Sequence, residues 1–329
     1  MNSTSHPAAL TIGFDIGGTN LRAGVVDASG GLVETVAVPT PRDASEAEEA
    51  IVGLVDGLRS RHDVGAVGLA VAGFLDPKCE TLRFAPHLPW RDAPLRRILA
   101  EKIGLPVRLE HDANAAAWGE YRYGAGRDAG TWVFFAVGTG IGATLMLDGE
   151  IYRGAFGTAP EFGHLTVVQG PEARLCSCGK KGCLERYASG TALVDTAREL
   201  APKYPDSELA TDLDTGADVT GSVVVQDARN GDPLAVAVLS DFADWLGLGL
   251  SFVADLLDPE LIVIGGGVAS DADLYLDRAC STMTGSMVGS GHRPAPRVAT
   301  AVLGGTAGMI GVADLARQLL PGAGNSSED

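Results

Sequence analysis

A histidine and three cysteines stand close together in the middle of the chain, at a spacing that suits a metal. The four residues are His164, Cys176, Cys178 and Cys183. One imidazole and three thiolates form a closed tetrahedral ligand set of structural zinc, so the segment 161–185 is predicted to bind Zn²⁺. The alternative is a group of buried thiols packed as small apolar side chains, but the Gly, Ser and Lys residues between them favour a polar loop. Glu161 and Glu185 flank the segment and are expected beside the metal without binding it.

Two glycine-rich turns each follow a short apolar run and carry residue types that bind phosphate. The first turn contains Asp15, Gly17, Gly18, Thr19 and Asn20, and the second contains Gly138, Thr139 and Gly140. Bare glycines let backbone amides approach phosphate oxygens, and a threonine hydroxyl adds a donor. Asp15, at the end of its apolar run, is suited to orient Mg²⁺ through water. One such turn alone is also typical of an ordinary hairpin, but the matched pair favours nucleotide binding.

A third glycine group follows another buried apolar segment. It consists of Gly265, Gly266 and Gly267. Such a run would lie flat under a nucleotide base or ribose, or it would serve as a tight crossing from strand to helix. The sequence supports both interpretations equally.

Asp112 is the predicted general base. It stands between the predicted strand VRLEH (107–111) and an alanine-rich segment with the pattern of a helix. Its other interpretation is an ordinary N-cap. The two roles are compatible, because a helix N-terminus favours an ionised carboxylate. The carboxyl end of a strand is also where open α/β sheets bind ligands.

The chain is strongly acidic, which bears on its partners. It has 25 Lys and Arg against 42 Asp and Glu, a formal net charge of −17. That field repels phosphate backbones and anionic lipid, so we expect neither a nucleic acid nor a membrane as partner. The sequence contains no run of eighteen uninterrupted apolar residues, so we expect no membrane-spanning helix. The first ten residues lack the pattern of a secretory signal. An odd cysteine count, with Cys79 and Cys280 isolated, is typical of a reducing compartment, so we expect a cytoplasmic protein.

Two stretches of the chain repeat one pattern of strands and turns. Residues 10–40 predict three strands joined by tight turns, and residues 131–155 repeat this arrangement around their own glycine turn. The repeat predicts an α/β protein of two similar α/β domains facing each other across a central cleft. We place the smaller domain at 9–125 together with a C-terminal helix at 306–320. The larger domain is placed at 126–305 and contains the zinc segment.

Three further stretches separate or follow these repeats. Asp76–Trp90 is rich in proline and charge and is predicted to be an irregular loop. Residues 203–220 are acidic and turn-rich and are predicted to be a surface excursion. Residues 222–260 predict two helices, the second of them long and apolar.

Six motifs, in order along the chain, resemble those of the ROK family of sugar kinases and regulators, within the actin-like ATPase and hexokinase group. They are DIGGTN (15–20), HDANAAAWGE (111–120), VGTGIG (137–142), EFGH (161–164), CSCGKKGCLE (176–185) and IGGGVA (264–269). They span nearly the whole chain, and the cysteine-rich motif is the most specific. The resemblance implies two actin-like, ribonuclease-H-like α/β domains with a cleft and a homodimer or homotetramer.

The same resemblance implies an ATP-dependent kinase that phosphorylates the C6 hydroxyl of glucose or a closely related hexose. ATP with Mg²⁺ would be held by the glycine turns, and Asp112 would accept the proton of the C6 hydroxyl as it attacks the γ-phosphorus. His164 would use one ring nitrogen for zinc and the other for the sugar. The hexose contacts carry over onto Gly73, Asp112, Asn114, Glu161, His164 and Glu185.

Two departures from the family pattern bear on the identity of the sugar. The glucokinases that this chain resembles usually have Asn directly before the catalytic Asp and an Asn-Leu-Pro-Trp loop; this chain has His111 and His87 in those places. We expect both histidines at the sugar. An imidazole is larger than an amide and can accept a proton or a hydrogen bond from an amine. An amino-hexose such as kanosamine is therefore a candidate substrate beside glucose.

The resemblance leaves other functions open. The protein could be a regulator, a sugar sensor without catalysis, a glucokinase that uses polyphosphate or a glucokinase strictly specific for glucose. The regulators carry a winged helix before the first glycine turn, whereas fourteen residues precede Asp15 here, and the acidic charge also disfavours DNA. A polyphosphate user is expected to have a basic groove, and no Lys/Arg cluster stands out. An assay that compares ATP with polyphosphate as donor distinguishes the last alternative.

Overall fold

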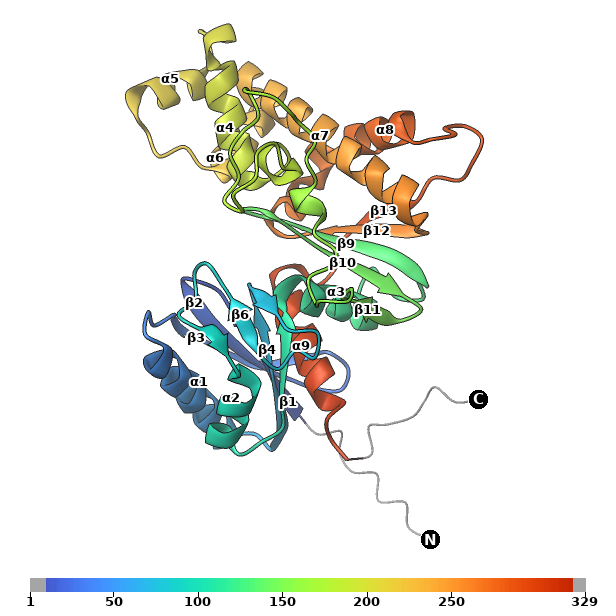
Figure 1. Ribbon diagram of the computed structural model, residues 1–329. Coiled ribbons are helices and arrows are strands. Elements are labelled where there is room, and N and C mark those ends of the chain that lie inside the picture. Colours follow the sequence, from blue (N-terminus) through green and yellow to red (C-terminus); the bar gives the residue numbers. More distant parts are fainter. Residues whose placement is uncertain (1–9, 322–329) are drawn as a thin grey trace. The chain divides into compact units, whose positions relative to one another are not determined.

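The computed structural model describes residues 10–321, which form two compact α/β units (Figure 1). The first unit contains the chain up to Asp128, Glu150–Pro160 and the chain from Gly305 onward, and the second contains Ala129–Gly149 and Glu161–Gly304. The predicted α/β class is confirmed. The predicted boundaries put residues 150–160 in the larger domain, whereas the structure groups them with the first unit. Residue 9, where the predicted smaller domain begins, lies outside the described residues.

The first unit is built on a five-stranded sheet of order β3-β2-β1-β4-β8. The strands are β1 (Leu10–Ile16), β2 (Asn20–Val26), β3 (Leu32–Pro39), β4 (Val64–Val71) and β8 (Val107–His111). The three strands predicted within residues 10–40 are confirmed as β1, β2 and β3, which pair antiparallel. Strand β4 runs parallel to both β1 and β8. The turn after β1 and the residue after β8 therefore lie at the same edge of the sheet.

Helices cover both faces of this sheet. They are α1 (Ala44–Arg59), α2 (Leu95–Ile103), α3 (Asp112–Tyr123) and α9 (Ala307–Arg317). Alternate residues of a strand face opposite sides, and on β1 the side chains of Ile12 and Phe14 join the core that contains α1 and α2. Gly13 faces α9, where a Cβ atom would stand only 1.9 Å from the backbone oxygen of Met309. Glycine thus lets α9 lie directly on the sheet.

The predicted irregular loop at Asp76–Trp90 is wrong in part, because a small antiparallel sheet forms there. Its strands are β5 (Phe74–Leu75), β6 (Leu82–Phe84) and β7 (Arg91–Ala93). The Asp76 carboxylate closes the β5–β6 turn by accepting hydrogen bonds from the backbone N–H groups of Lys78, Glu80 and Thr81. An aspartate that bonds its own following backbone is a turn device. The remaining strand of the first unit is β11 (Glu150–Tyr152).

The second unit repeats the strand arrangement of the first. Strands β10 (Ile141–Leu147), β9 (Thr131–Val137), β12 (Leu261–Gly265) and β13 (Arg297–Thr300) are neighbours in that order. Strand β9 pairs antiparallel with β10 and parallel with β12, and β12 runs parallel to β13. This is the pattern of β2, β1, β4 and β8. The internal repeat seen in the sequence is therefore a repeat of structure.

Helices form most of the rest of the second unit. They are α4 (Gly190–Leu200), α5 (Glu208–Thr215), α6 (Gly221–Arg229), α7 (Pro233–Leu257) and α8 (Leu276–Ser286). The two helices predicted within 222–260 are confirmed as α6 and α7. Helix α5 lies where only a surface excursion was predicted, and its start is fixed by the hydroxyl of Ser207, which accepts from the Ala210 N–H.

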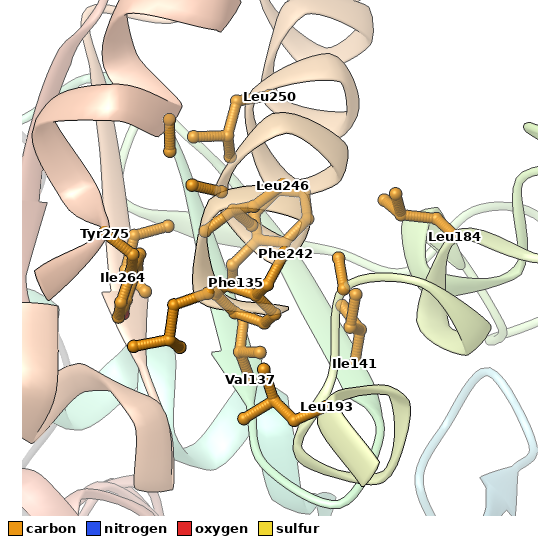
Figure 2. Packing of buried hydrophobic residues seen from close by; sticks show 14 of the residues in the cluster. Phe135, Val137, Ile141, Leu184, Leu193, Phe242, Leu246, Leu250, Ile264 and Tyr275 are labelled. Carbon is orange, nitrogen blue, oxygen red and sulfur yellow. The ribbon is translucent and has the colours of Figure 1, made fainter. Parts of the chain in front are cut away.

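Helix α7 forms the centre of the second core. Figure 2 shows Phe242 and Leu246 of α7 packed with Phe135 of β9 and Ile264 of β12, all of which are buried. By length and composition alone α7 could cross a membrane, yet 56% of its apolar window is buried within the protein. We therefore describe it as the core helix of the second unit.

Candidate functional site

The four predicted zinc ligands converge in the second unit. One ligand atom from each of them lies within 4.8 Å of those of the other three. The Nδ1 atom of His164 is 3.7 Å from Cys176 Sγ, and Cys178 Sγ is 3.7 Å from Cys183 Sγ. Tetrahedral Zn–S bonds of ~2.3 Å would put sulfur atoms about 3.8 Å apart. The donor set and its spacing fit zinc.

Burial and mutual proximity make Cys176 and Cys183 reluctant to ionise without a cation. The pKa of Cys178, by contrast, is lowered, because its burial is outweighed by hydrogen bonds from the Lys180 backbone and the other two thiols. Burial raises the pKa of Cys183 to about 12, and the neighbouring Cys178 and Cys176 thiols act in the same direction. Burial also raises the pKa of Cys176. A metal ion offsets the repulsion among thiolates and displaces their protons on binding. The cluster is therefore suited to a cation rather than to three free thiolates.

The local backbone folds the cysteines back toward the histidine. Cys176 N donates to Lys180 O at 2.8 Å, and Gly179 N donates to Cys176 O at 3.0 Å, which closes a tight turn. Gly182 has a φ of +75°, and a Cβ atom there would stand 1.8 Å from the backbone oxygen of Val168. Only glycine satisfies both conditions. The glycine and lysine residues of the motif thus shape the loop.

The two carboxylates that flank the cluster have different surroundings. Glu161 precedes the short helix η1 (Phe162–His164), is exposed, and holds its Oε2 3.9 Å from His164 Nε2. The histidine therefore turns Nδ1 to the thiols and Nε2 to Glu161. Glu185, in η2 (Leu184–Arg186), accepts a hydrogen bond from the Ile141 N–H at 2.9 Å, and its other oxygen is 3.7 Å from Cys176 Sγ. Glu185 thus connects the cysteine cluster to the start of β10.

A cavity of about 870 Å³ opens in the second unit, within the size range of small-molecule sites. Three residues predicted to bind nucleotide line it: Gly138, Thr139 and Gly267. The sequence analysis missed the rest of the wall, which includes Gly190, Thr191, Gly221, Ser222, Gln226, Arg229 and Asp271. Four of these missed residues begin α4 and α6. The capping residues Ser189 and Thr220 directly before them were the available signal.

The predicted nucleotide-binding glycines of this unit differ in whether the surrounding structure leaves room for a side chain. At Gly138 and Gly267, φ is ordinary. Apart from the residues directly before and after each glycine, no described residue would have an atom within 4 Å of an added Cβ. Packing among the described residues therefore gives no reason for glycine at these two positions. At Gly265 and Gly266 a Cβ would collide with the Phe134 ring and the Val137 carbonyl, so these two make the strand-to-helix crossing. At Gly140 a Cβ would stand 2.2 Å from Glu185 Oε2.

The first glycine turn lies at the carboxyl end of β1. Its backbone is held by Gly17 N donating to Asn20 O and by Thr40 N donating to Thr19 O. Gly18 and Thr19 are exposed. His87 lies against this turn, because a Cβ on Gly18 would be 2.7 Å from His87 Cβ.

Asp15, the predicted magnesium-orienting residue, already has a cationic partner. Its carboxylate forms an ion pair with Arg22, which stands opposite Asp15 in the β1–β2 register. Mg²⁺ bound through water would therefore share this carboxylate with a guanidinium.

Asp112 is the first residue of α3, and the N-cap position belongs to His111. The interpretation of Asp112 as an ordinary N-cap is thus wrong. Its side chain is 45% exposed, and its Oδ1 lies 3.3 Å from His111 Nε2. Its Oδ1 also accepts a hydrogen bond from the Ala113 backbone N–H at 2.7 Å, which favours the ionised form. A half-exposed carboxylate at a helix N-terminus and at the carboxyl edge of the sheet can act as a base.

Two other predicted sugar contacts of the first unit are held by packing. Asn114 is buried, and its Nδ2 donates to Glu110 Oε1 at 3.1 Å. Gly73 follows β4, and a Cβ there would be 2.7 Å from both the Phe84 oxygen and Ala85 Cβ. Each residue has a structural reason for its identity.

The predicted site residues therefore fall into two groups, each assembled within one unit. The glycine turn, His87 and Asp112 belong to the first unit, and the zinc cluster with its carboxylates belongs to the second. A model of the ROK family matches residues 11–319. The chain belongs to the ROK family.

Similar ROK proteins include kinases that match over nearly their full length. A glucokinase of Streptomyces coelicolor is 42% identical over 94% of this chain and 98% of its own length. A ROK family glucokinase of Streptomyces griseus, solved with glucose and AMPPNP, is 43% identical, with a TM-score of 0.82 over 94% of this chain and all of that one. A ROK hexokinase of Thermus thermophilus is 33% identical, with a TM-score of 0.74 over 93% and 97%.

One further residue of this ROK chain was missed by the sequence analysis. Glu110 is fully buried in β8, two residues before Asp112, and it forms ion pairs with Arg108 and Arg153. The available signal was the alternation of side chains along VRLEH (107–111), which puts the opposite charges of Arg108 and Glu110 on one face of the strand.

Proposed function

We propose that this protein is an ATP-dependent kinase that phosphorylates the C6 hydroxyl of glucose or a closely related hexose. The observation that carries the proposal is Asp112, a half-exposed carboxylate in the first turn of a helix, at the carboxyl edge of the sheet, where the Ala113 N–H favours its ionised form. Full-length similarity to glucokinases, one of them solved with glucose and an ATP analogue, supports the same reaction. Asp112 accepts the proton of the sugar hydroxyl during its attack on the γ-phosphorus.

The nucleotide belongs in the 870 Å³ cavity of the second unit. The open glycines Gly138 and Gly267 let its phosphates or ribose approach the backbone, and the starts of α4 and α6 supply N–H groups with a favourable dipole. In the first glycine turn, Gly18 and Thr19 are exposed and carry donor groups of the kind that binds phosphate. Mg²⁺, oriented by Asp15, supplies charge neutralisation for the transferred phosphoryl group.

Zinc has a structural function in this proposal. Four protein ligands leave no open coordination position, so the metal takes no part in the chemistry. The cluster fixes the ring of His164 with Nδ1 on the metal side, which leaves Nε2 beside Glu161 for a sugar hydroxyl. Glu161 and Glu185 provide further hydroxyl acceptors.

The sugar is an amino-hexose such as kanosamine or glucose itself, and two histidines support the first choice. His87 lies against the first glycine turn and His111 lies 3.3 Å from the Asp112 carboxylate. An imidazole is larger than an asparagine amide, and it can accept a proton from an amine, which an amide cannot.

Asp112→Asn tests the assignment of the base. The exchange conserves shape, so the variant is expected to fold and to retain zinc, while kcat falls by about 10²- to 10⁴-fold, the usual contribution of a general base. Coupled ADP release with glucose, mannose, glucosamine and kanosamine measures the rate, and metal analysis measures zinc. Near-normal turnover in a folded D112N protein would refute Asp112 as the base.

A further inference from the structure

Glu110 is a buried carboxylate for which the proposed reaction has no direct use. It lies in β8, two residues before Asp112, and its side chain has no exposed surface. Burying a carboxylate is costly unless it is paired and hydrogen-bonded. Its partners therefore indicate what it does.

Two of these partners lie on either side of Asp112. Glu110 Oε1 accepts from the backbone N–H of His111 at 3.1 Å and from Asn114 Nδ2 at 3.1 Å. These bonds hold the residue before Asp112 and the first turn of α3 after it. The backbone that carries Asp112 is thus fixed from two points by one side chain.

The other partners keep this carboxylate charged. Burial alone would raise the pKa of Glu110, but the charges and hydrogen bonds of Arg153 and Arg108, with the Asn114 bond, lower it below its usual value. Arg153 belongs to Glu150–Pro160, the segment that enters the first unit from elsewhere in the sequence. Glu110 therefore joins β8, α3 and that segment through one ionised group.

We propose that Glu110 is a positioning residue that holds Asp112 in its productive orientation, with Arg153 acting through Glu110. The inference rests on the proposed function of Asp112. Glu110 does not touch the substrate; it fixes the turn from which Asp112 reaches the sugar hydroxyl. A displacement of ~1 Å at a reacting group lowers a rate by about 10²-fold.

Glu110→Gln tests the proposal, because it keeps the shape and removes the charge. We expect kcat to fall by about tenfold or more while the KM for ATP stays within about twofold, since the lost interaction concerns the reacting geometry and not nucleotide binding. Arg153→Gln is expected to lower kcat less. The double variant E110Q/R153Q is expected to have a kcat no lower than that of E110Q, because both changes remove the same ion pair.

Asp314→Asn is the matched control. Asp314 is also buried, and it accepts from Trp118 Nε1 and the Tyr123 hydroxyl, which lie farther along the same helix α3. A merely structural role for Glu110 predicts that E110Q and D314N both lower the unfolding midpoint and that both keep kcat. A folded E110Q protein with the kcat of the wild type overturns the proposal. If E110Q does not fold, an R153Q protein with the kcat of the wild type overturns it.

The wild-type protein separates this proposal from the proposed function. If it shows no ATP-dependent phosphorylation of any hexose, the proposed function fails and the positioning role fails with it. If it is active and D112N is inactive while E110Q is unimpaired, only the positioning role of Glu110 fails.

Discussion

His111 and Asp112 are adjacent in the chain and have different structural duties. The imidazole occupies the N-cap position without a side-chain capping bond, and its Nε2 faces the neighbouring carboxylate. A side chain that does not cap its helix is available to a ligand. Substrate preference is therefore expected to depend on His111, while turnover depends on Asp112.

His111→Asn is expected to shift the ratio of kcat/KM for amino-hexose over glucose toward glucose by about tenfold. That factor corresponds to one hydrogen bond of ~1.4 kcal/mol, within the net range for such bonds. Parallel kinetics with glucose, glucosamine and kanosamine measure the ratio. An unchanged ratio in an active variant would show that His111 does not select the sugar, and His87→Asn then becomes the next variant to measure.

Residues that come together through local spacing could be placed from the sequence. The three cysteines and His164 form their cluster within twenty residues, and Asp112 is recognisable from the strand before it and the helix after it. Glu110 was not predictable as a positioning residue, because its partner Arg153 is 43 residues away. Nothing in the local pattern of either residue indicates the other.

At the scale of elements, the structure separates glycines that packing requires from a glycine that packing does not explain. Gly265 and Gly266 are needed by neighbouring backbone and rings, whereas Gly138 is next to the cavity with space around it. The sequence shows the same letter at all three positions. Only the packed structure distinguishes them, as it also shows the starts of α4 and α6 joining one cavity wall.

Gly138→Val is expected to raise the KM for ATP by about tenfold or more, because the added side chain enters space that the nucleotide requires. Stability should change little, since the site has room for a side chain and φ is ordinary. Gly285→Val in α8 is the control, as that glycine is equally unencumbered among the described residues and lies outside the cavity wall. A folded G138V protein with an unchanged KM for ATP would remove the nucleotide from this cavity.

At the scale of the whole molecule, one arrangement of strands occurs twice, and the segments that follow its strands differ between the two copies. The first copy carries Asp112 after its last parallel strand, and the second carries the zinc segment after its hairpin. The sequence revealed the repeat because both copies begin with an apolar strand and a glycine turn. It did not reveal that residues 150–160 join the first unit, because the Arg153–Glu110 ion pair forms only on folding.

Removing zinc is expected to affect sugar binding and stability more than nucleotide binding. Without the metal, Cys176 and Cys183 protonate, since burial raises the pKa of both thiols, that of Cys183 to about 12. The ring of His164 then loses its anchor. Prolonged chelation should lower the unfolding midpoint and raise the KM for hexose several-fold, while the Kd of an ATP analogue changes little. Equal losses of sugar and nucleotide affinity would contradict a role confined to the sugar, and restored kinetics after zinc addition is the control.

The helix α9 lies on glycines of the first sheet, and this has a consequence for the order in which the protein is made. The strands β1 and β4 that receive α9 emerge from the ribosome early, whereas Ala307–Arg317 emerges only after the whole second unit has been synthesised. Until then Gly13 and Gly68 face no helix, because the backbone of Met309 and Val312 that fills their space does not yet exist. The half of the molecule that is translated first is thus completed last. A nascent chain holds that sheet face open while about 240 further residues are synthesised, roughly 12–50 s at usual elongation rates.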